Sequence, residues 1–266
     1  MQITSRDNSL LRQARLVRDG KDDELIYIEG LRLADEALRS GLKIEAVIIS
    51  DQLARKQRVV PTIDALSKVS NRVASVTERL LETISYTKTP QGIVVLAHRP
   101  ASNVDLDAAS FPEAALIVVL HEINNPVNVG AILRTAEAAG VSGVITTKHT
   151  SDPLSPKSLR GAMGSAFRLP LWTGSDYSQA IDWCQSNGIS TVSSAATARH
   201  SHTEMDWTKS TALILGPEST GLNDDEIKMT DHTVKIPMNG EVESLNVSVA
   251  AGIILFEAAR QRGFNR

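Results

Sequence analysis

The chain has 266 residues, a formal net charge of −3 and a single cysteine. This length suits one large domain or two smaller ones, and the 42% of hydrophobic residues is enough for a core. Because Cys184 is the lone cysteine, a disulfide framework and a thiolate-rich metal site are excluded. We expect Cys184 to be a small, partly buried hydrophobic residue. No apolar run approaches a membrane span, and the amino terminus has no apolar signal core. A cytoplasmic protein without a membrane partner is therefore expected.

Basic side chains are more frequent in the first part of the chain. Residues 1–100 carry 16 Lys and Arg against 13 Asp and Glu, whereas residues 101–266 carry 12 against 18. One cluster of cations lies within the first 21 residues and consists of Arg6, Arg12, Arg15, Arg18 and Lys21. Such clusters are common on solvated helix faces, and the negative total argues against a protein that binds nucleic acid with its whole surface.

The first hundred residues predict a small α/β unit. Apolar periodicity predicts helices at residues 3–21, 31–38, 53–66 and 80–84, and short apolar runs predict strands at residues 25–28, 46–49 and 92–97. The next residues lose this periodicity and contain two prolines, as a linker does. We therefore expect a first domain at 1–98, a linker at 99–112 and a second domain at 113–266.

Beyond the linker, strand and helix patterns alternate, which predicts a mostly parallel sheet covered by helices on both faces. Strands are expected at residues 115–120, 144–147, 189–193, 212–215 and 233–236, and helices at residues 129–139, 155–163, 178–187 and 245–262. The last of these helices is apolar around nearly its whole circumference. A helix of this kind must be buried on more sides than its own sheet covers, so a partner subunit or a chain wrapped over it is predicted.

Three loops that follow predicted strands carry polar residues suited to chemistry. In the first, Asn128 and Arg134 lie near the start and in the second turn of a predicted helix. Both can face the crevice beyond the carboxyl ends of the strands, where open α/β sheets bind ligands. The second loop, at residues 216–221, holds Glu218, and the third leads from residue 236 to Ser244 and Asn246. Glycines in these loops let a ligand approach the backbone closely.

Each of these residues also has an ordinary structural explanation. Asn128 could cap a helix, Glu218 could accept hydrogen bonds within its own turn, and Ser244 could cap the last helix. Arg134 is harder to explain in this way, because a cation amid alanines on a packed helix needs a partner, either a phosphate or Glu218. The sequence contains no dinucleotide-binding or P-loop motif and no G-x-S-x-G, and its histidines lack metal-ligand spacing.

Taken together, the three loops read N-P-x-N-x-G-x-x-x-R, G-P-E-S-x-G-L and I-P-M-x-G-x-x-x-S-L-N-V-S-x-A. In this order they resemble the motifs of the SpoU/TrmH family of RNA ribose 2′-O-methyltransferases, within the SPOUT superfamily. The resemblance covers residues 113–266 and implies an α/β fold with a carboxyl-terminal trefoil knot, an exception to the rule that chains are unknotted. It also implies S-adenosylmethionine as the cofactor and a homodimer joined through the knot. The segment I-Y-I-E-G-L-R-L-A-D-E-A-L resembles the small substrate-binding domain of the family's ribosomal-RNA enzymes.

The resemblance further implies roles for individual residues. Arg134 matches the arginine that contacts the target phosphate, and the polar positions that orient it and the ribose are matched by Asn128, Glu218, Ser244 and Asn246. The residues that match cofactor-binding positions are Ser194, Ala195, Gly216, Ile236, Met238 and Leu245. RNA rather than DNA is the implied partner, no metal is implied, and the candidate RNA contacts are Arg6, Arg12, Arg15 and Arg32. Because the pKa of arginine is so high, we interpret Arg134 as a phosphate clamp and leave the general base open.

The amino-terminal domain favours large-subunit (23S-type) ribosomal RNA as the substrate, because simpler members of the family that act on transfer RNA lack it. Two alternatives stay open at this point. One is a transfer-RNA ribose 2′-O-methyltransferase, and the other is a non-catalytic RNA-binding factor for ribosome assembly that keeps the fold. Degraded motifs would favour the second alternative, and the motifs here are intact.

Overall fold

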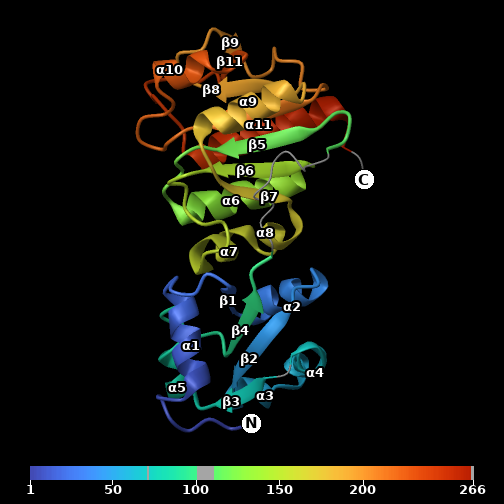
Figure 1. Cartoon of the computed structure of the whole chain (residues 1–266). Coiled ribbons are helices and arrows are strands. Elements are labelled where there is room, and N and C mark those ends of the chain that lie inside the picture. Colours follow the sequence, from blue (N-terminus) through green and yellow to red (C-terminus); the bar gives the residue numbers. More distant parts are fainter. Residues whose placement is uncertain (71, 101–110, 265–266) are drawn as a thin grey trace. The chain divides into compact units, whose positions relative to one another are not determined.

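A computed structural model of the chain describes residues 1–70, 72–100 and 111–264. Its contacts divide the chain into two compact units (Figure 1). The first unit comprises Met1–Ala101 together with Pro153–Arg168, and the second comprises Ser102–Asp152 together with Leu169–Arg266. Most of the linker expected at residues 99–112 lies outside the described residues. Within the described ranges, no helix is both long enough and apolar enough to cross a membrane.

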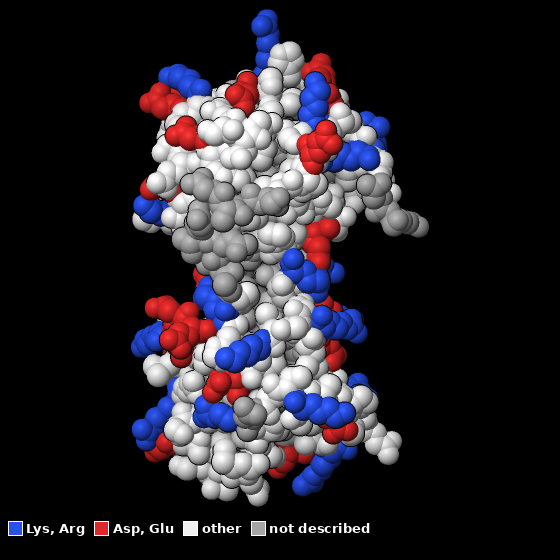
Figure 2. All heavy atoms as spheres, turned by 45° about the vertical axis from the view of Figure 1, so that its right-hand side comes forward, with Lys and Arg blue, Asp and Glu red and all other residues white. Residues whose placement is uncertain are grey.

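Charged side chains of both signs are distributed over the surface of each unit. On the face drawn in Figure 2, Lys and Arg side chains alternate with Asp and Glu, and no broad basic groove is visible. This agrees with the small net charge of −3. Contact with a polyanion would therefore depend on local groups of cations rather than on a field from the whole surface.

The first unit is built on a mixed sheet with strand order β1-β4-β2-β3. The strands are β1 (Leu25–Glu29), β2 (Ile44–Ser50), β3 (Val73–Val76) and β4 (Ile93–His98). β4 is antiparallel to both of its neighbours, and β3 is parallel to β2. The helices are α1 (Ser9–Arg18), α2 (Leu31–Arg39), α3 (Asp51–Ala54), α4 (Val60–Val69) and α5 (Glu78–Glu82), with a short 3-10 helix at Gln57–Val59. Two later helices, α7 (Pro156–Ala162) and α8 (Ser165–Arg168), belong to the same unit.

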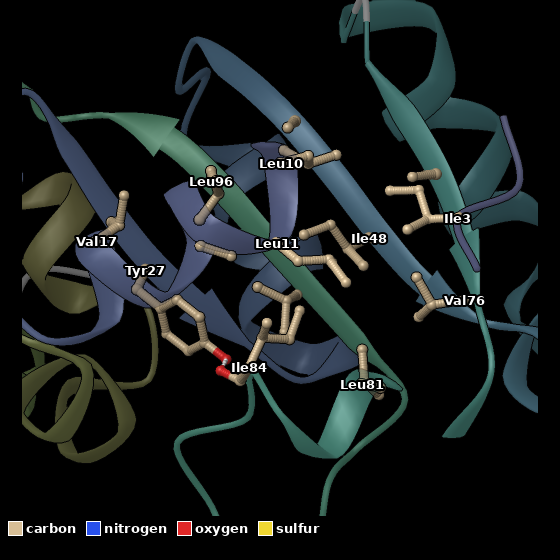
Figure 3. Close-up of a cluster of buried hydrophobic side chains, with 14 of the residues drawn as sticks. Ile3, Leu10, Leu11, Val17, Tyr27, Ile48, Val76, Leu81, Ile84 and Leu96 are labelled. Carbon is tan, nitrogen blue, oxygen red and sulfur yellow. Dashed lines mark hydrogen bonds between the residues drawn. The ribbon is translucent and has the colours of Figure 1, made fainter. Parts of the chain in front are cut away.

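Helix α1 covers one face of this sheet because its apolar residues fall on one side. Its buried residues are Leu10, Leu11, Ala14 and Val17, and they join a cluster with side chains of β1, β2, β4 and α5 (Figure 3). Tyr27 lies in this cluster and donates its hydroxyl hydrogen to the carbonyl oxygen of Ile84 at 2.7 Å. The ring is therefore buried while its polar group is satisfied, and burial raises the pKa of Tyr27 well above its usual value.

The described part of the second unit contains a seven-stranded sheet of order β7-β6-β5-β10-β8-β11-β9, in which every pair is parallel. Its strands are β5 (Leu116–Leu120), β6 (Gly143–Thr147), β7 (Leu171–Ser175), β8 (Ser190–Ser194), β9 (His200–Ser201), β10 (Thr211–Leu215) and β11 (His232–Lys235). All residues of β5, β6 and β10 are buried, as expected of central strands covered on both faces. The α/β class and the parallel sheet predicted from the sequence are confirmed.

Four helices accompany this sheet in the described residues: α6 (Pro126–Ala138), α9 (Tyr177–Ser186), α10 (Asp224–Lys228) and α11 (Val247–Arg262). Cys184 of α9 is buried in a cluster with residues of β5, β6 and β10, as predicted for a small hydrophobe. Burial raises the pKa of the Cys184 thiol to about 12, which keeps it protonated and unreactive. Helices α6 and α11 pack against each other, so the first motif and the last motif of the sequence are held together.

The carboxyl end of α11 is attached to the rest of its unit by Arg262. The guanidinium donates hydrogen bonds to the carbonyl oxygens of Trp207 at 2.7 Å, Lys209 at 2.6 Å and Ala115 at 3.3 Å, and also to that of Ala114. Burial lowers the pKa of Arg262 from its ordinary value, but the group stays charged at neutral pH. One side chain thus satisfies carbonyl groups from two separate segments.

Replacing Arg262 with alanine is expected to lower the free energy of unfolding by about 2 kcal/mol, because several carbonyl groups lose a charged donor at once. Urea denaturation followed by circular dichroism measures this change. The matched control is Arg260→Ala on the same helix, because the guanidinium of Arg260 is exposed and pairs with Glu257 within the helix. Equal stability of Arg262→Ala and Arg260→Ala would contradict the anchoring role.

Candidate active site

The carboxyl ends of the parallel strands bring the three predicted loops to one edge of the second sheet. From β5 the chain proceeds to β6 and β7 on one side, whereas β10, β8 and β11 lie on the other side. The order of strands therefore reverses between β5 and β10. Open α/β sheets bind ligands at such a point.

Glu218 joins the loop after β10 to the loop after β5. Its carboxylate accepts hydrogen bonds from the backbone N–H of Asn124 at 3.2 Å, from that of Asn125 at 3.1 Å and from the side-chain amide of Asn128 at 3.2 Å. Burial is the largest single influence and raises the pKa of Glu218, but the hydrogen bonds together outweigh it. The pKa of Glu218 is therefore lowered, and the carboxylate is charged at neutral pH.

Asn128 extends this network to the segment before α11. The residue is buried, and its Oδ1 accepts a hydrogen bond from Nδ2 of Asn246 at 3.2 Å. Asn246 in turn caps α11, since its Oδ1 accepts a hydrogen bond from the backbone N–H of Ser248 at 2.9 Å. A continuous chain of hydrogen bonds thus runs from Glu218 through Asn128 to Asn246 and links all three loops.

Two of the ordinary structural explanations considered for the polar residues are wrong. The cap of α6 is Asn125 rather than Asn128, and the cap of α11 is Asn246 rather than Ser244. The proposed role for Glu218 within its own turn misses its main partners, which lie about ninety residues earlier in the chain. Glu218, Asn128 and Asn246 therefore join the loops to one another, in addition to the cap that Asn246 provides for α11.

Arg134 projects from α6 and is exposed to solvent. Across the described part of the chain, no hydrogen bond or ion pair joins its guanidinium to another residue. The pairing with Glu218 that the sequence allowed does not occur, because that carboxylate is taken up by the loop after β5. Arg134 is thus available to an external anion, and a guanidinium is well suited to bind a phosphate with two parallel hydrogen bonds.

A cavity of about 530 Å³ opens at the same edge of the sheet. It is lined by the end of β8, the loop after β10, the loop after β11 and the segment that leads into α11. All six residues predicted to hold the cofactor lie on its wall: Ser194, Ala195, Gly216, Ile236, Met238 and Leu245. Glu218 and Ser244 also line it, whereas Asn128 and Asn246 reach it only through the hydrogen-bond network.

Gly216 shows how closely the cavity wall is packed. A Cβ atom added at this position would lie 2.7 Å from the backbone nitrogen of Leu222, so a larger residue would force the loop open. The wall also includes Asp224 and Glu243, two carboxylates that the sequence reasoning missed. Both follow closely after a motif glycine, and their position beside glycine-rich loops is the signal that would have indicated them.

The predicted RNA contacts lie in the first unit. Arg15 of α1 donates a hydrogen bond to the carbonyl oxygen of Arg6 at 3.1 Å, and Arg12 lies one turn earlier on the same helix. These three arginines therefore form one group, in which Arg6 and Arg12 are exposed. Arg32 is also exposed but belongs to the first turn of α2.

Comparison with known proteins identifies the family. A model described as the SpoU rRNA methylase family matches residues 115–256, and a model described as an MRM3-like substrate binding domain matches residues 11–95. The chain belongs to the SpoU rRNA methylase family. This confirms the resemblance carried by the three motifs and accounts for both units of the chain.

Individual SpoU relatives extend over nearly the whole chain. The 23S rRNA (guanosine-2′-O-)-methyltransferase RlmB of Vibrio cholerae is 32% identical, covering 92% of this chain and 99% of its own length. The AdoMet-bound rRNA methyltransferase from Sinorhizobium meliloti has a TM-score of 0.85 and 29% identity, covering 98% of this chain and 97% of that one. The SpoU methyltransferase AviRb from Streptomyces viridochromogenes, in complex with AdoMet, has a TM-score of 0.85 and 27% identity, covering 97% of this chain and 100% of that one.

For this SpoU protein, Glu218→Gln is expected to lower the free energy of unfolding by about 1 kcal/mol at pH 7, because the charged acceptor of three hydrogen bonds becomes a neutral one. The pKa of Glu218 is lowered in the folded state, so its stabilisation is present above the unfolded pKa and is lost as pH falls through the folded pKa. The difference in the free energy of unfolding between the wild type and Glu218→Gln should therefore become smaller as the pH falls. Urea denaturation at several pH values measures it, and a difference that stays constant down to about pH 3 would contradict the assignment.

Proposed function

We propose that the chain transfers the methyl group of S-adenosylmethionine to the 2′-hydroxyl of a ribose in large-subunit (23S-type) ribosomal RNA, in the cytoplasm. The observation that carries this proposal is the cavity built by the second and third motif loops, joined by a hydrogen-bond network to the helix that presents Arg134. Relatives that align with 82% to 96% of this chain are named as 23S rRNA guanosine 2′-O-methyltransferases, which favours this substrate over transfer RNA.

The cavity suits S-adenosylmethionine in size and in charge. Its volume of about 530 Å³ lies within the range of roughly 300–1,000 Å³ that is typical of small-molecule sites. The backbones of Gly216, Ile236 and Leu245 offer hydrogen-bonding groups for the adenine and carboxylate, and Asp224 and Glu243 favour a cationic ligand. When it is bound, the cofactor supplies a methyl group already activated by a positively charged sulfur.

Orientation is the main task left to the protein, because a ribose hydroxyl is a poor nucleophile near neutral pH. We assign Arg134 to the phosphate next to the target ribose, where its charge fixes the RNA and stabilises negative charge that develops on the oxygen. Glu218 binds Asn128, and Asn128 binds Asn246. These hydrogen bonds hold the first turn of α6 and the start of α11 in fixed positions. The guanidinium keeps its proton at neutral pH, so another group accepts the proton of the hydroxyl.

We further propose that two copies of the chain associate through α11, the region where the family resemblance places the knot. Val249, Ile253 and Phe256 are spaced four and three residues apart, so they form one stripe, and their exposed fractions are 50%, 37% and 44%. The opposite side of the helix, including Ile254 and Leu255, is buried within the unit. A second copy would cover the exposed stripe, because a contiguous apolar surface of this kind favours association.

Transfer of labelled methyl from S-adenosylmethionine to purified RNA tests the proposal. Ribosomal and transfer RNA are taken from cells that lack this gene, so that the target site is unmodified. Label in the large-subunit ribosomal RNA is the expected result. Label in transfer RNA alone would overturn the substrate class. A protein that binds no S-adenosylmethionine would instead favour the non-catalytic assembly factor.

A further inference from the structure

The segment between α5 and β4 is held by side chains from α1 and β1 rather than by regular secondary structure. Arg18 of α1 donates hydrogen bonds from one guanidinium nitrogen to the carbonyl oxygens of Thr83 and Ser85, both at 3.3 Å. Between these two, the carbonyl oxygen of Ile84 accepts the hydroxyl of Tyr27 (Figure 3). Three consecutive carbonyl groups are therefore fixed by side chains that lie far away in the sequence.

Glu29 fixes the next two residues of this segment. Its carboxylate accepts hydrogen bonds from the backbone N–H of Tyr86 at 2.9 Å and that of Thr87 at 3.2 Å, and from the hydroxyl of Thr87 at 2.7 Å. The residue is only 7% exposed, and no ion pair in the described part of the chain balances its charge. A buried carboxylate is costly unless its hydrogen bonds compensate it. The buried charge of Glu29 is therefore used to fix the conformation of this one loop.

This rigid support presents an aromatic ring to solvent. The side chain of Tyr86 is 44% exposed, whereas Tyr27 is buried in the core of the same unit. No hydrogen bond from the hydroxyl of Tyr86 and no ring contact is found among the described residues. The ring therefore adds little to the core, although five consecutive backbone positions are fixed around it. Because the backbone that carries the ring is already fixed, a ligand can bind it without the entropic cost of ordering the loop.

Basic side chains lie on α1, the helix that contacts this loop. Arg12, Arg15 and Arg18 are spaced three residues apart on the helix, so they occupy neighbouring positions of its surface. Arg18 contacts the loop directly through two of its carbonyl groups, and Asp19 balances its charge at 2.8 Å. Arg12 is exposed and has no ion pair among the described residues, so it can meet a phosphate. A cation and an exposed aromatic ring on neighbouring elements match a strand of RNA, whose phosphates and unstacked bases alternate.

We propose that Tyr86 is a stacking platform for an unpaired base of the RNA substrate, with Arg12 of α1 on a neighbouring phosphate. The inference rests on the proposed function and adds to it a single-stranded element that the first unit recognises. Base stacking on an aromatic ring tolerates different bases, so the platform holds a loop or bulge of the RNA without reading its sequence.

Tyr86→Ala and Tyr86→Phe test this proposal together. Tyr86→Ala is expected to weaken binding to ribosomal RNA about ten-fold and to raise KM by a similar factor, with kcat and S-adenosylmethionine binding unchanged. Tyr86→Phe keeps the ring and should bind RNA as the wild type does. The control Val69→Ala removes another exposed apolar side chain, from α4 of the same unit, and should change none of these quantities.

Ultraviolet cross-linking gives a second, independent readout. Irradiation of the wild-type protein with labelled ribosomal RNA should join a nucleotide to the peptide that contains Tyr86, as identified by mass spectrometry. In one contrary outcome, the wild type transfers methyl to ribosomal RNA and Tyr86→Ala keeps the same RNA binding and KM. That result would overturn the platform and leave the proposed function standing. Absence of transfer to any RNA by the wild type would instead overturn the proposed function. Weakened RNA binding in Tyr86→Phe equal to that in Tyr86→Ala would assign the effect to the hydroxyl and also overturn the stacking role.

Discussion

Arg134→Ala should abolish methyl transfer while leaving the affinity for S-adenosylmethionine unchanged. The guanidinium is exposed, lacks a partner among the described residues and does not line the cavity, so its removal neither breaks the fold nor opens the cofactor site. Loss of a charged group that stabilises the transition state typically lowers kcat by about 100-fold to 1,000-fold. Single-turnover methyl transfer measures the chemical step, and a titration with the cofactor measures binding.

Two further variants make the result specific. Arg134→Lys keeps the charge but loses the planar fork of donors, so an intermediate rate is expected. Lys209→Ala removes an exposed cation of the same unit that pairs with Asp206 at the amino-terminal edge of the sheet, and it should transfer methyl at the wild-type rate. Full activity in Arg134→Ala would show that this residue has no part in the mechanism. A parallel loss of cofactor binding would show that it acts on the cavity instead.

The double variant Ile253→Glu and Phe256→Glu should be monomeric and inactive, whereas the wild type is expected to be a dimer. Burying each apolar side chain of this kind contributes about 1.5–3 kcal/mol to association, and a carboxylate in their place would be costly to bury. The exposed stripe lies on α11, directly after the segment that lines the cavity, so separation of the copies should also disturb the site. Sedimentation equilibrium at micromolar concentration measures the change in mass.

The control for this double variant is Leu16→Glu, which places a carboxylate at an exposed leucine of α1 in the other unit. It should remain a dimer. A wild-type protein that sediments as a monomer would contradict the proposed association outright. A dimeric but inactive double variant would show that the exposed stripe acts on the site within one copy.

The central strands of the second unit could be predicted from the sequence because burial on both faces leaves a continuous apolar run. β5, β6 and β10 are of this kind. β7 was missed because it lies at the edge of the sheet, where its Thr173, Gly174 and Ser175 are not fully buried. β9 has only two residues, which is too short for a periodic signal. β3 lies at the edge of its sheet, and only two of its four residues are buried.

Local patterns also carry no information about which distant segments meet. Helix α7 was predicted within residues 155–163, but nothing in its sequence indicates that it packs with β1 in the first unit. In the site, the motif residues could be located one by one, and six of them line one cavity. The partners of Glu218 could not be found, because the hydrogen bonds depend on β5 and β10 being neighbours in the sheet. The cap of α6 is Asn125, directly before Pro126 and three residues before Asn128, which the sequence offered as an alternative cap.

The most direct test of a ribose methyltransferase is the resistance of its product to alkali. After transfer of labelled methyl to large-subunit ribosomal RNA, alkaline hydrolysis cleaves every linkage except the one that follows a 2′-O-methylated ribose, because that oxygen can no longer attack the phosphate. The wild type should yield label in a single alkali-resistant dinucleotide, and Arg134→Ala should yield no such label. Label released as a mononucleotide would place the methyl group on a base and contradict methylation of the ribose.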